Sequence, residues 1–139
     1  MSMETLRLPA TMESLEPFRR FVLERLQRLN MAQEVVFKIE LVLEEALTNV
    51  VHYAYPGAEG DVEVGCSLED NKRFCLCVKD WGLPFNPLER PDPKMSEEIW
   101  ERQVGGLGIY LIRHLVDELH YQRQEGGNLM TFCFHFPAA

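Results

Sequence analysis

The stretch ELVLEEALTNVVHYAY, residues 40–55, decides the fold of this chain. Apolar residues recur there at three- and four-residue steps, which predicts one buried stripe along a helix. They are Ile39, Val42, Leu43, Ala46, Leu47, Val50 and Ala54. Glu45, Asn49 and His52 follow one another at spacings of four and three, so they share the face opposite that stripe.

Glu45 and Asn49 form the first candidate site on this helix. Asparagine inside a helix costs about half a kcal/mol relative to alanine, and the local pattern does not require it. A carboxylate and an amide oxygen one turn apart suit a hard cation such as Mg²⁺, which prefers oxygen ligands. A solvated helix face would explain the same two residues. For His52, a structural role competes with a place in a binding pocket.

The overall composition predicts one globular domain. The chain has 139 residues, enough for a single core over 1–139 without stabilisation by disulfides or metals. Its net charge of −8 disfavours direct nucleic-acid binding, which needs a basic surface. The first residues lack a signal-peptide pattern and no stretch has the length of a membrane span, so we expect a cytoplasmic protein without membrane contact.

The four cysteines contain no CxxC pair. In a chain without an export signal we expect Cys66, Cys75, Cys77 and Cys133 to be reduced, small hydrophobic residues. An alternative is a metal clamp formed by the last three of these with His135, if their strands were neighbours.

The remaining chain alternates between strand and helix patterns. We expect strands at 4–9, 60–69, 74–79, 118–124 and 128–136, and helices at 11–29, at about 32–55 and after 108. A proline-rich segment at about 86–104 has no periodicity and is typical of a lid, although a surface insertion would have the same pattern.

Asp80 and Gly82 stand where a strand ends and this long loop begins. A buried aspartate there could accept a hydrogen bond from an exocyclic amine such as that of adenine, and a glycine would let the ring approach closely. Asp-x-Gly is also a common strand-ending turn.

A second glycine motif follows the loop. Gly105, Gly106 and Gly108 open a predicted helix, where free backbone amides would face an anion. The motif is no Walker A loop, since no Lys-Ser/Thr follows, and no GxGxxG, since Leu111 holds the third glycine position. A simple glycine hinge between loop and helix is the competing interpretation.

Taken in order, these motifs resemble those of the GHKL ATPases, the superfamily of gyrase, histidine-kinase and MutL ATP-binding domains. The string EEALTNVVHYAY and the short chain are most similar to anti-sigma-factor serine/threonine protein kinases. The resemblance implies a two-layer α/β sandwich, with three helices on one face of a mixed, mostly antiparallel sheet, and ATP with Mg²⁺ under a lid.

The same resemblance implies roles for particular residues. Asn49 would coordinate Mg²⁺, and Glu45 would act as base or orient the attacking group. Asp80 and Gly82 would bind adenine. The remaining implied contacts are Gly105, Gly106 and Gly108 to phosphates, Thr131 to the adenine pocket, and Arg102 to the terminal phosphate, with two extra residues before the glycines.

The resemblance also implies protein partners. Such kinases phosphorylate an antagonist of the STAS type, which binds near an arginine that Arg20, or less securely Arg19, resembles. A sigma factor as a second partner and a homodimer are implied as well. Two alternatives stay open: a nucleotide-binding module that switches partners without transferring phosphate, and the catalytic domain of a histidine kinase.

Overall fold

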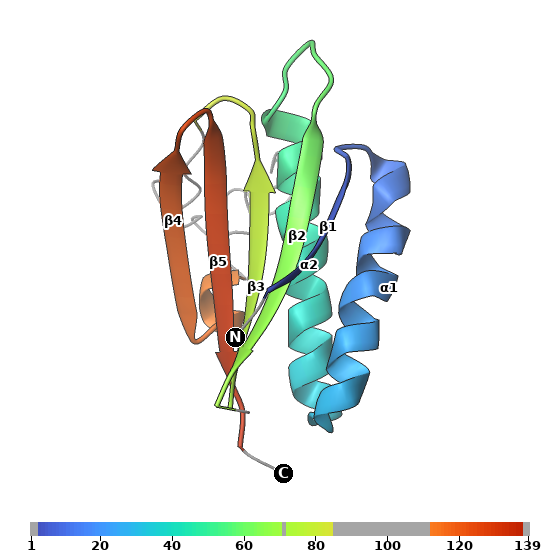
Figure 1. Cartoon of the computed structure of the whole chain (residues 1–139), viewed down its shortest axis with the longest axis vertical. Coiled ribbons are helices and arrows are strands. Elements are labelled where there is room, and N and C mark those ends of the chain that lie inside the picture. The colour runs from blue at the N-terminus through green and yellow to red at the C-terminus, as the bar shows by residue number, and fades with distance from the viewer. Residues whose placement is uncertain (1–2, 71, 85–111, 138–139) are drawn as a thin grey trace, which may run out of the picture.

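The computed structural model describes residues 3–70, 72–84 and 112–137, which form a sheet with helices packed on one face (Figure 1). The strands are β1 (Glu4–Pro9), β2 (Asp61–Glu69), β3 (Arg73–Asp80), β4 (Glu118–Gln124) and β5 (Gly127–His135). The helices are α1 (Leu15–Leu26), flanked by the 3-10 helices η1 (Met12–Ser14) and η2 (Gln27–Leu29), and α2 (Gln33–Tyr53).

The sheet has the order β1-β2-β3-β5-β4, and each of these four pairings is antiparallel. β3 therefore lies at the centre, between its hairpin partner β2 and the distant β5. The register sets Asp80 at the end of β3 opposite Asn128 near the start of β5. Two polar residues that are 48 positions apart in sequence thus meet at one end of the sheet.

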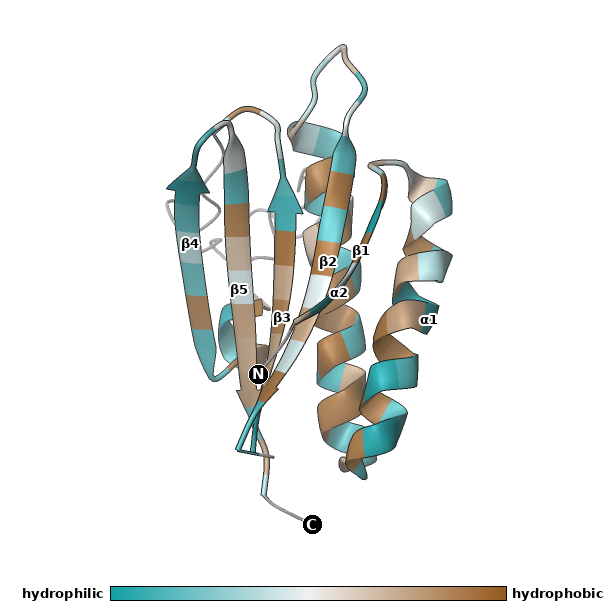
Figure 2. Ribbon diagram, in the orientation of Figure 1, coloured by the Kyte–Doolittle hydropathy of each residue, from teal (hydrophilic) through white to brown (hydrophobic). Residues whose placement is uncertain are grey.

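The core lies between the sheet and the two long helices. Hydrophobic residues gather on β3, β5 and α2, whereas the edge strand β4 is mostly hydrophilic (Figure 2). The largest fully buried side chains come from every layer: Phe18, Ile39, Leu47, Leu76, Phe74, Phe132 and Phe134 among them. All seven residues of the predicted apolar stripe of α2 are buried, so this helix is the main support of the sheet.

The two-layer α/β sandwich is confirmed, with one difference. We expected a mixed sheet, but every pairing among the described strands is antiparallel. The predicted strands at 4–9 and 118–124 have the observed bounds. The first helix is shorter than expected because its two ends tighten into 3-10 turns. Of the third helix, the structure describes only residues 112–115, and the predicted lid lies outside the described residues.

The expectation of four reduced cysteines is wrong for two of them. Cys75 and Cys133 are joined by a disulfide, because β3 and β5 pair with these residues directly opposite each other. Cys66, which is buried, and the half-buried Cys77 are free thiols. The described residues contain no group of three metal-ligating side chains, so the proposed clamp with His135 does not form within them.

Among the described residues, no helix is both long and apolar enough to cross a membrane.

Candidate functional site

The site is built on α2, which carries Glu45 and Asn49 one turn apart. Asn49 is only 5% exposed, and Glu45 is half-buried. The side-chain oxygens Oδ1 of Asn49 and Oε2 of Glu45 are both buried, and neither has a hydrogen-bond partner among the described residues. A buried polar atom without a partner costs about 1–3 kcal/mol. Two such oxygens on neighbouring turns indicate a site that a ligand completes.

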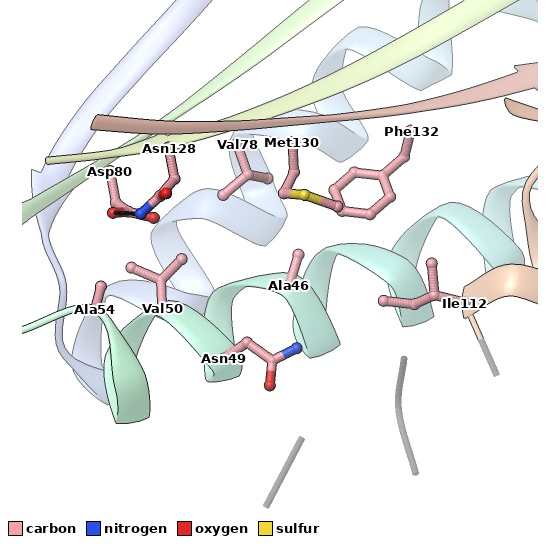
Figure 3. A pocket seen from close by; sticks show the side chains of 10 residues that line it. All are labelled: Ala46, Asn49, Val50, Ala54, Val78, Asp80, Ile112, Asn128, Met130 and Phe132. Carbon is pink, nitrogen blue, oxygen red and sulfur yellow. Dashed lines mark hydrogen bonds between the residues drawn. The ribbon is translucent and has the colours of Figure 1, made fainter. Parts of the chain in front are cut away.

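Asn49 and Asp80 line the same pocket between α2 and the sheet (Figure 3). The enclosed cavity is small, about 30 Å³, and the empty space including its open mouth is about 450 Å³. Its lining is mostly apolar: Ala46, Asn49, Val50, Ala54, Val78, Asp80, Ile112, Asn128, Met130 and Phe132. The described residues therefore form the floor of a site with polar groups at two places.

Figure 3 shows that these two polar places lie apart from each other. Asp80 and Asn128 lie side by side on the sheet, above Val50 and Ala54. Asn49 projects from the flank of α2, at the edge of the pocket, and does not point at Asp80. An elongated ligand could bind its apolar end near the carboxylate and its polar end near the amide.

Asp80 is held in one orientation by two donors. The backbone N–H of Gly82 and the side-chain amide Nδ2 of Asn128 each donate to its Oδ1, both at 2.9 Å. Its other oxygen, Oδ2, accepts no hydrogen bond from a described residue and is free to accept one from a ligand. Burial raises the pKa of Asp80, while the two hydrogen bonds and the nearby Arg123 oppose this shift.

Asn128 is a site residue that the sequence analysis missed. It is 3% exposed, and its Nδ2 also donates to the carbonyl oxygen of Leu83 at 2.7 Å. Its Oδ1 accepts from the hydroxyl of Tyr121 and from Arg123. An asparagine directly after a Gly-Gly turn was the available signal, but only the pairing of β5 with β3 brings it to Asp80.

Thr131 does not lie where the sequence analysis expected it. Side chains alternate along β5, and Asn128, Met130 and Phe132 face the pocket. Thr131 is therefore on the opposite face of the sheet, where its hydroxyl lies 3.9 Å from Sγ of Cys77. Thr131 therefore does not line this pocket, whereas Asn128, three residues earlier on β5, does.

Gly82 allows a close approach, but the group that approaches it is the backbone of Ala54 and not a ligand. A Cβ on Gly82 would lie 2.1 Å from the carbonyl oxygen of Ala54, the residue that ends α2. The same carbonyl accepts a hydrogen bond from the N–H of Leu83 at 3.0 Å. Gly82 thus fixes the end of β3 against α2, and this contact positions Asp80.

Tyr55 also fixes the segment that follows Asp80, through hydrogen bonds of its hydroxyl to backbone groups. Its hydroxyl accepts a hydrogen bond from the backbone N–H of Trp81 at 2.8 Å and donates to the carbonyl oxygen of Asp61. The ring packs so tightly on Gly60 that a Cβ there would lie 2.2 Å from it. The segment after Asp80 is therefore fixed by α2, β2 and β5 together, and the carboxylate is preorganised.

Glu45 is a more basic carboxylate than an exposed glutamate. Burial is the main cause that raises its pKa, and the negative charge of Glu44 adds to the shift. A carboxylate with a raised pKa accepts a proton more readily than an exposed one.

His52, by contrast, is exposed and does not line the pocket; its ring makes an edge contact with Tyr53.

The predicted partner-binding arginines lie on α1. Arg19 donates from Nε to Glu40 at 3.0 Å and from Nη1 to Glu16 at 3.3 Å. Arg20 is exposed and forms no ion pair with a described residue. The remaining predicted site residues, Arg102, Gly105, Gly106 and Gly108, lie outside the described part of the chain.

The donor set fits a nucleotide with a divalent cation. Buried carboxylate and amide oxygens without partners are ligands, direct or through water, that Mg²⁺ prefers. A fixed carboxylate oxygen on an otherwise apolar floor suits a flat ring that carries an amino group.

Comparison with known proteins identifies the class. The family model of the histidine kinase-like ATPase domain matches residues 8–134. The chain therefore belongs to the family of histidine kinase-like ATPase domains. A crystal structure of the RsbU and RsbW domains of a Mycobacterium tuberculosis protein has the same fold, with a TM-score of 0.65 at 20% identity over 99% of this chain and 34% of that one.

Within that family, the chain is similar to named protein kinases. It is 32% identical to the serine/threonine-protein kinase BtrW of Bordetella bronchiseptica over 101 residues, which cover 71% of this chain and 70% of the relative. It is 28% identical to the serine-protein kinase RsbW of Bacillus thuringiensis over 87% of this chain and 78% of the relative.

Proposed function

We propose that this protein is an ATP- and Mg²⁺-dependent serine/threonine protein kinase of the anti-sigma-factor type. It phosphorylates a STAS-domain antagonist, has a sigma factor as a second partner, and acts as a homodimer in the cytoplasm. The observation that carries this proposal is the pair of buried, unpartnered oxygens on Glu45 and Asn49 beside a pocket whose floor holds Asp80. The named kinases among the relatives support the transfer reaction.

Adenine binds at one end of the pocket and the cation at the other. Oδ2 of Asp80 accepts a hydrogen bond from the exocyclic amino group of adenine, and Asn128 holds that carboxylate by donating to its Oδ1. Asn49 holds the cation at the pocket edge. When bound, Mg²⁺ supplies positive charge to the transferring phosphoryl group. Glu45, with its raised pKa, orients the acceptor hydroxyl and receives its proton.

Nucleotide binding is tested with Asp80→Asn. The substitution replaces the accepting Oδ2, or its partner oxygen, with a donor that clashes electrostatically with an incoming amine. We expect ATP affinity, measured by titration calorimetry, to fall by roughly 100-fold or more. The matched control is Asp61→Asn, which removes a half-exposed carboxylate paired with Arg7 and should leave ATP affinity unchanged. Equal affinity in wild type and Asp80→Asn would refute the pocket assignment.

Phosphoryl transfer is tested separately. The protein is incubated with Mg-ATP and the STAS-domain protein encoded nearest to it, and the partner's mass is then measured. We expect one added phosphoryl group with the wild type and none with Glu45→Gln, which should still bind ATP. ATP binding without transfer by the wild type would instead support the partner-switching module.

A further inference from the structure

Two residues of the edge strand β4 fix the side-chain amide of Asn128. Arg123 lies directly opposite Asn128 in the pairing of β4 with β5, and Tyr121 lies two residues earlier on the same face of β4. The hydroxyl of Tyr121 donates to Oδ1 of Asn128, and Nη1 of Arg123 donates to the same oxygen at 3.3 Å. Neither residue is among the described residues that line the nucleotide pocket. They can influence a ligand there through Asn128.

The groups around this amide favour one orientation of it. An asparagine amide accepts at its oxygen and donates at its nitrogen, so a half turn reverses its hydrogen bonding. A guanidinium only donates, so Oδ1 of Asn128 must face Arg123. Nδ2 then faces two acceptors, Oδ1 of Asp80 at 2.9 Å and the carbonyl oxygen of Leu83 at 2.7 Å. Donors on one side and acceptors on the other therefore hold the amide in the same orientation.

This orientation makes Asp80 a hydrogen-bond acceptor toward the pocket. Its Oδ1 receives the amide of Asn128 and the backbone N–H of Gly82, which leaves Oδ2 for a ligand. Burial raises the pKa of Asp80, whereas these two hydrogen bonds and the charge of Arg123 lower it. An ionised carboxylate accepts hydrogen bonds and cannot donate one. Asp80 would therefore attract an amino group on a ring and repel a carbonyl oxygen at the same ring position.

Loss of the donors from β4 would weaken this discrimination. Asn128 is 3% exposed, and an unpaired oxygen is costly at a buried position. Without Tyr121 and Arg123 the amide would gain by rotating, and its Nδ2 could then turn toward a carbonyl oxygen on the ring. Asp80 would lose a hydrogen bond that fixes it. Both changes would disfavour an amino group on the ligand and favour a carbonyl group.

We propose that Tyr121 and Arg123 are positioning residues that set the base selectivity of the pocket through Asn128. They direct the donors of Asn128 away from the ligand, so the pocket presents the acceptor of Asp80 to the ring. The selected ligand is a purine nucleotide with an exocyclic amino group at position 6. This inference rests on the proposed function for the presence of a nucleotide. The chain of hydrogen bonds from Tyr121 through Asn128 to Asp80 is observed independently of it.

The selectivity arm of the test compares ATP with ITP, which has a carbonyl oxygen where ATP has the amino group. Calorimetry gives Kd for both nucleotides. We expect the wild type to bind ATP at least roughly 100-fold more tightly than ITP. Tyr121→Phe should reduce this ratio by roughly fivefold or more. A general loss of packing would weaken both nucleotides alike, so an unchanged ratio in Tyr121→Phe overturns the proposal.

Variants of Arg123 test the second donor. Arg123→Met removes the donor and should lower the ratio, whereas Arg123→Lys keeps a cationic donor and should retain more of it. The control for the lost charge is Arg28→Met, which removes an exposed cation paired with Glu4. The control for β4 is Gln122→Ala, an exposed residue on the other face of the strand. Both controls should keep the wild-type ratio, and a wild-type ratio in Arg123→Met overturns the role of Arg123.

A double-mutant cycle tests the route through Asn128. It uses Tyr121, because Arg123 also donates to the carbonyl oxygen of Gly82 at 2.9 Å. In the Asn128→Ala background, Tyr121→Phe should not change the ratio further, since the amide on which it acts is absent. A change as large as in the wild-type background would show that Tyr121 acts independently of Asn128, and would overturn the proposal.

A measurement without ligand separates this inference from the proposed function. The Nδ2 protons of Asn128 are identified in ¹⁵N spectra as the pair missing from Asn128→Ala, and their exchange with solvent is timed. We expect exchange to be roughly tenfold faster or more in Tyr121→Phe than in the wild type. Equal rates overturn the fixed amide even if ATP binds selectively. If the wild type binds neither nucleotide, the base selectivity fails together with the proposed function, while slow exchange that depends on Tyr121 still supports the fixed amide.

Discussion

Asn49 combines a structural cost with a proposed ligand role. Its buried Oδ1 has no partner among the described residues, and asparagine is a poor helix former in the middle of α2. Natural proteins keep such residues where function requires them, at some loss of stability. The balance between these two effects can be measured at this one position.

We expect Asn49→Ala to increase the free energy of unfolding in the absence of nucleotide by about 1 kcal/mol, because it removes a buried unsatisfied group and improves helix propensity. The same variant should lose the rise in Tm that Mg-ATP gives the wild type. Thermal unfolding with and without Mg-ATP checks both effects. The control is Thr48→Ala on the neighbouring exposed face, which should retain the Mg-ATP shift.

Asn128 and Thr131 lie three residues apart on β5 but face opposite sides of the sheet. Asn128→Ala removes the donors to Asp80 and Leu83, so we expect a loss of about 2 kcal/mol of stability and roughly tenfold weaker ATP binding. Thr131→Ala should change ATP affinity by less than about twofold. Calorimetric titration of ATP into both variants shows which of the two residues supports the pocket. A larger effect at Thr131 would contradict the assignment of Asn128.

At the scale of elements, the junction between α2 and β3 positions the site. The end of β3 is fixed through Gly82 against Ala54, and through Trp81 to the hydroxyl of Tyr55. Arg123 adds a hydrogen bond from β4 to the carbonyl oxygen of Gly82 at 2.9 Å. The position of Asp80 therefore depends on contacts with the end of α2 and with β4, and not on β3 alone.

We expect Gly82→Ala to destabilise the protein by about 1–3 kcal/mol, because its Cβ would overlap the backbone of Ala54. ATP affinity should fall as well, since relief of the overlap moves the segment that holds Asp80. Gly126→Asn is the matched control: Gly126 has φ +67°, a conformation that asparagine tolerates, and no atom lies within 4 Å of an added Cβ. Urea unfolding should show little change for this control and a clear loss for Gly82→Ala.

Most elements could be predicted from local patterns. The apolar stripe of α2 and the alternation in β2, β3 and β5 identify the buried faces, because each repeat matches the period of one secondary structure. The sheet order was not accessible in this way. Nothing local in β3 or β5 states that these strands pair, and without that pairing neither the Cys75–Cys133 disulfide nor the contact of Asn128 with Asp80 can be foreseen.

The candidate site was predicted only as far as short motifs reach. Glu45 and Asn49 share a helix face, so their spacing alone placed them together. That face was expected opposite the apolar stripe, but Asn49 is buried and lines the pocket together with Ala46 and Val50 of the stripe. Asp80 joins Asn49 at the same pocket, as the order of motifs suggested. Thr131 was misplaced because the face of a strand changes at every residue, so an offset of three reverses the side on which a side chain lies.

For the molecule as a whole, buried carboxylates and surface ion pairs act on stability in opposite directions. Burial raises the pKa of Glu45 and of Asp80 in the folded state. Each therefore favours the folded state at a pH below its unfolded pKa, and this contribution is lost as the pH rises through the folded pKa. Hydrogen bonds from Arg73 and His135 lower the pKa of Glu118, whose contribution is present at neutral pH and is lost as the pH falls.

We expect Glu45→Gln to be more stable than the wild type at pH 7, with the difference shrinking as the pH falls toward the unfolded pKa of glutamate, about 4. Glu118→Gln should show the opposite trend: less stable than the wild type at pH 7, with that deficit shrinking in acid. Denaturant unfolding across this pH range measures both differences. A pH-independent difference for Glu45→Gln would show that its carboxylate titrates alike in the folded and unfolded states.

Trp81 gives the protein a built-in optical probe. Its indole ring lies under the guanidinium of Arg7, 3.9 Å from the ring centre, and its backbone joins Asp80 directly to the Gly82 contact. Indole emission responds to nearby charge, so a ligand that moves the end of β3 should change the fluorescence of this residue. The sequence contains one other tryptophan, Trp100, and its replacement by phenylalanine would leave a single emitter, directly after Asp80 in the chain. Binding could then be followed in real time, without a label attached to either nucleotide or protein.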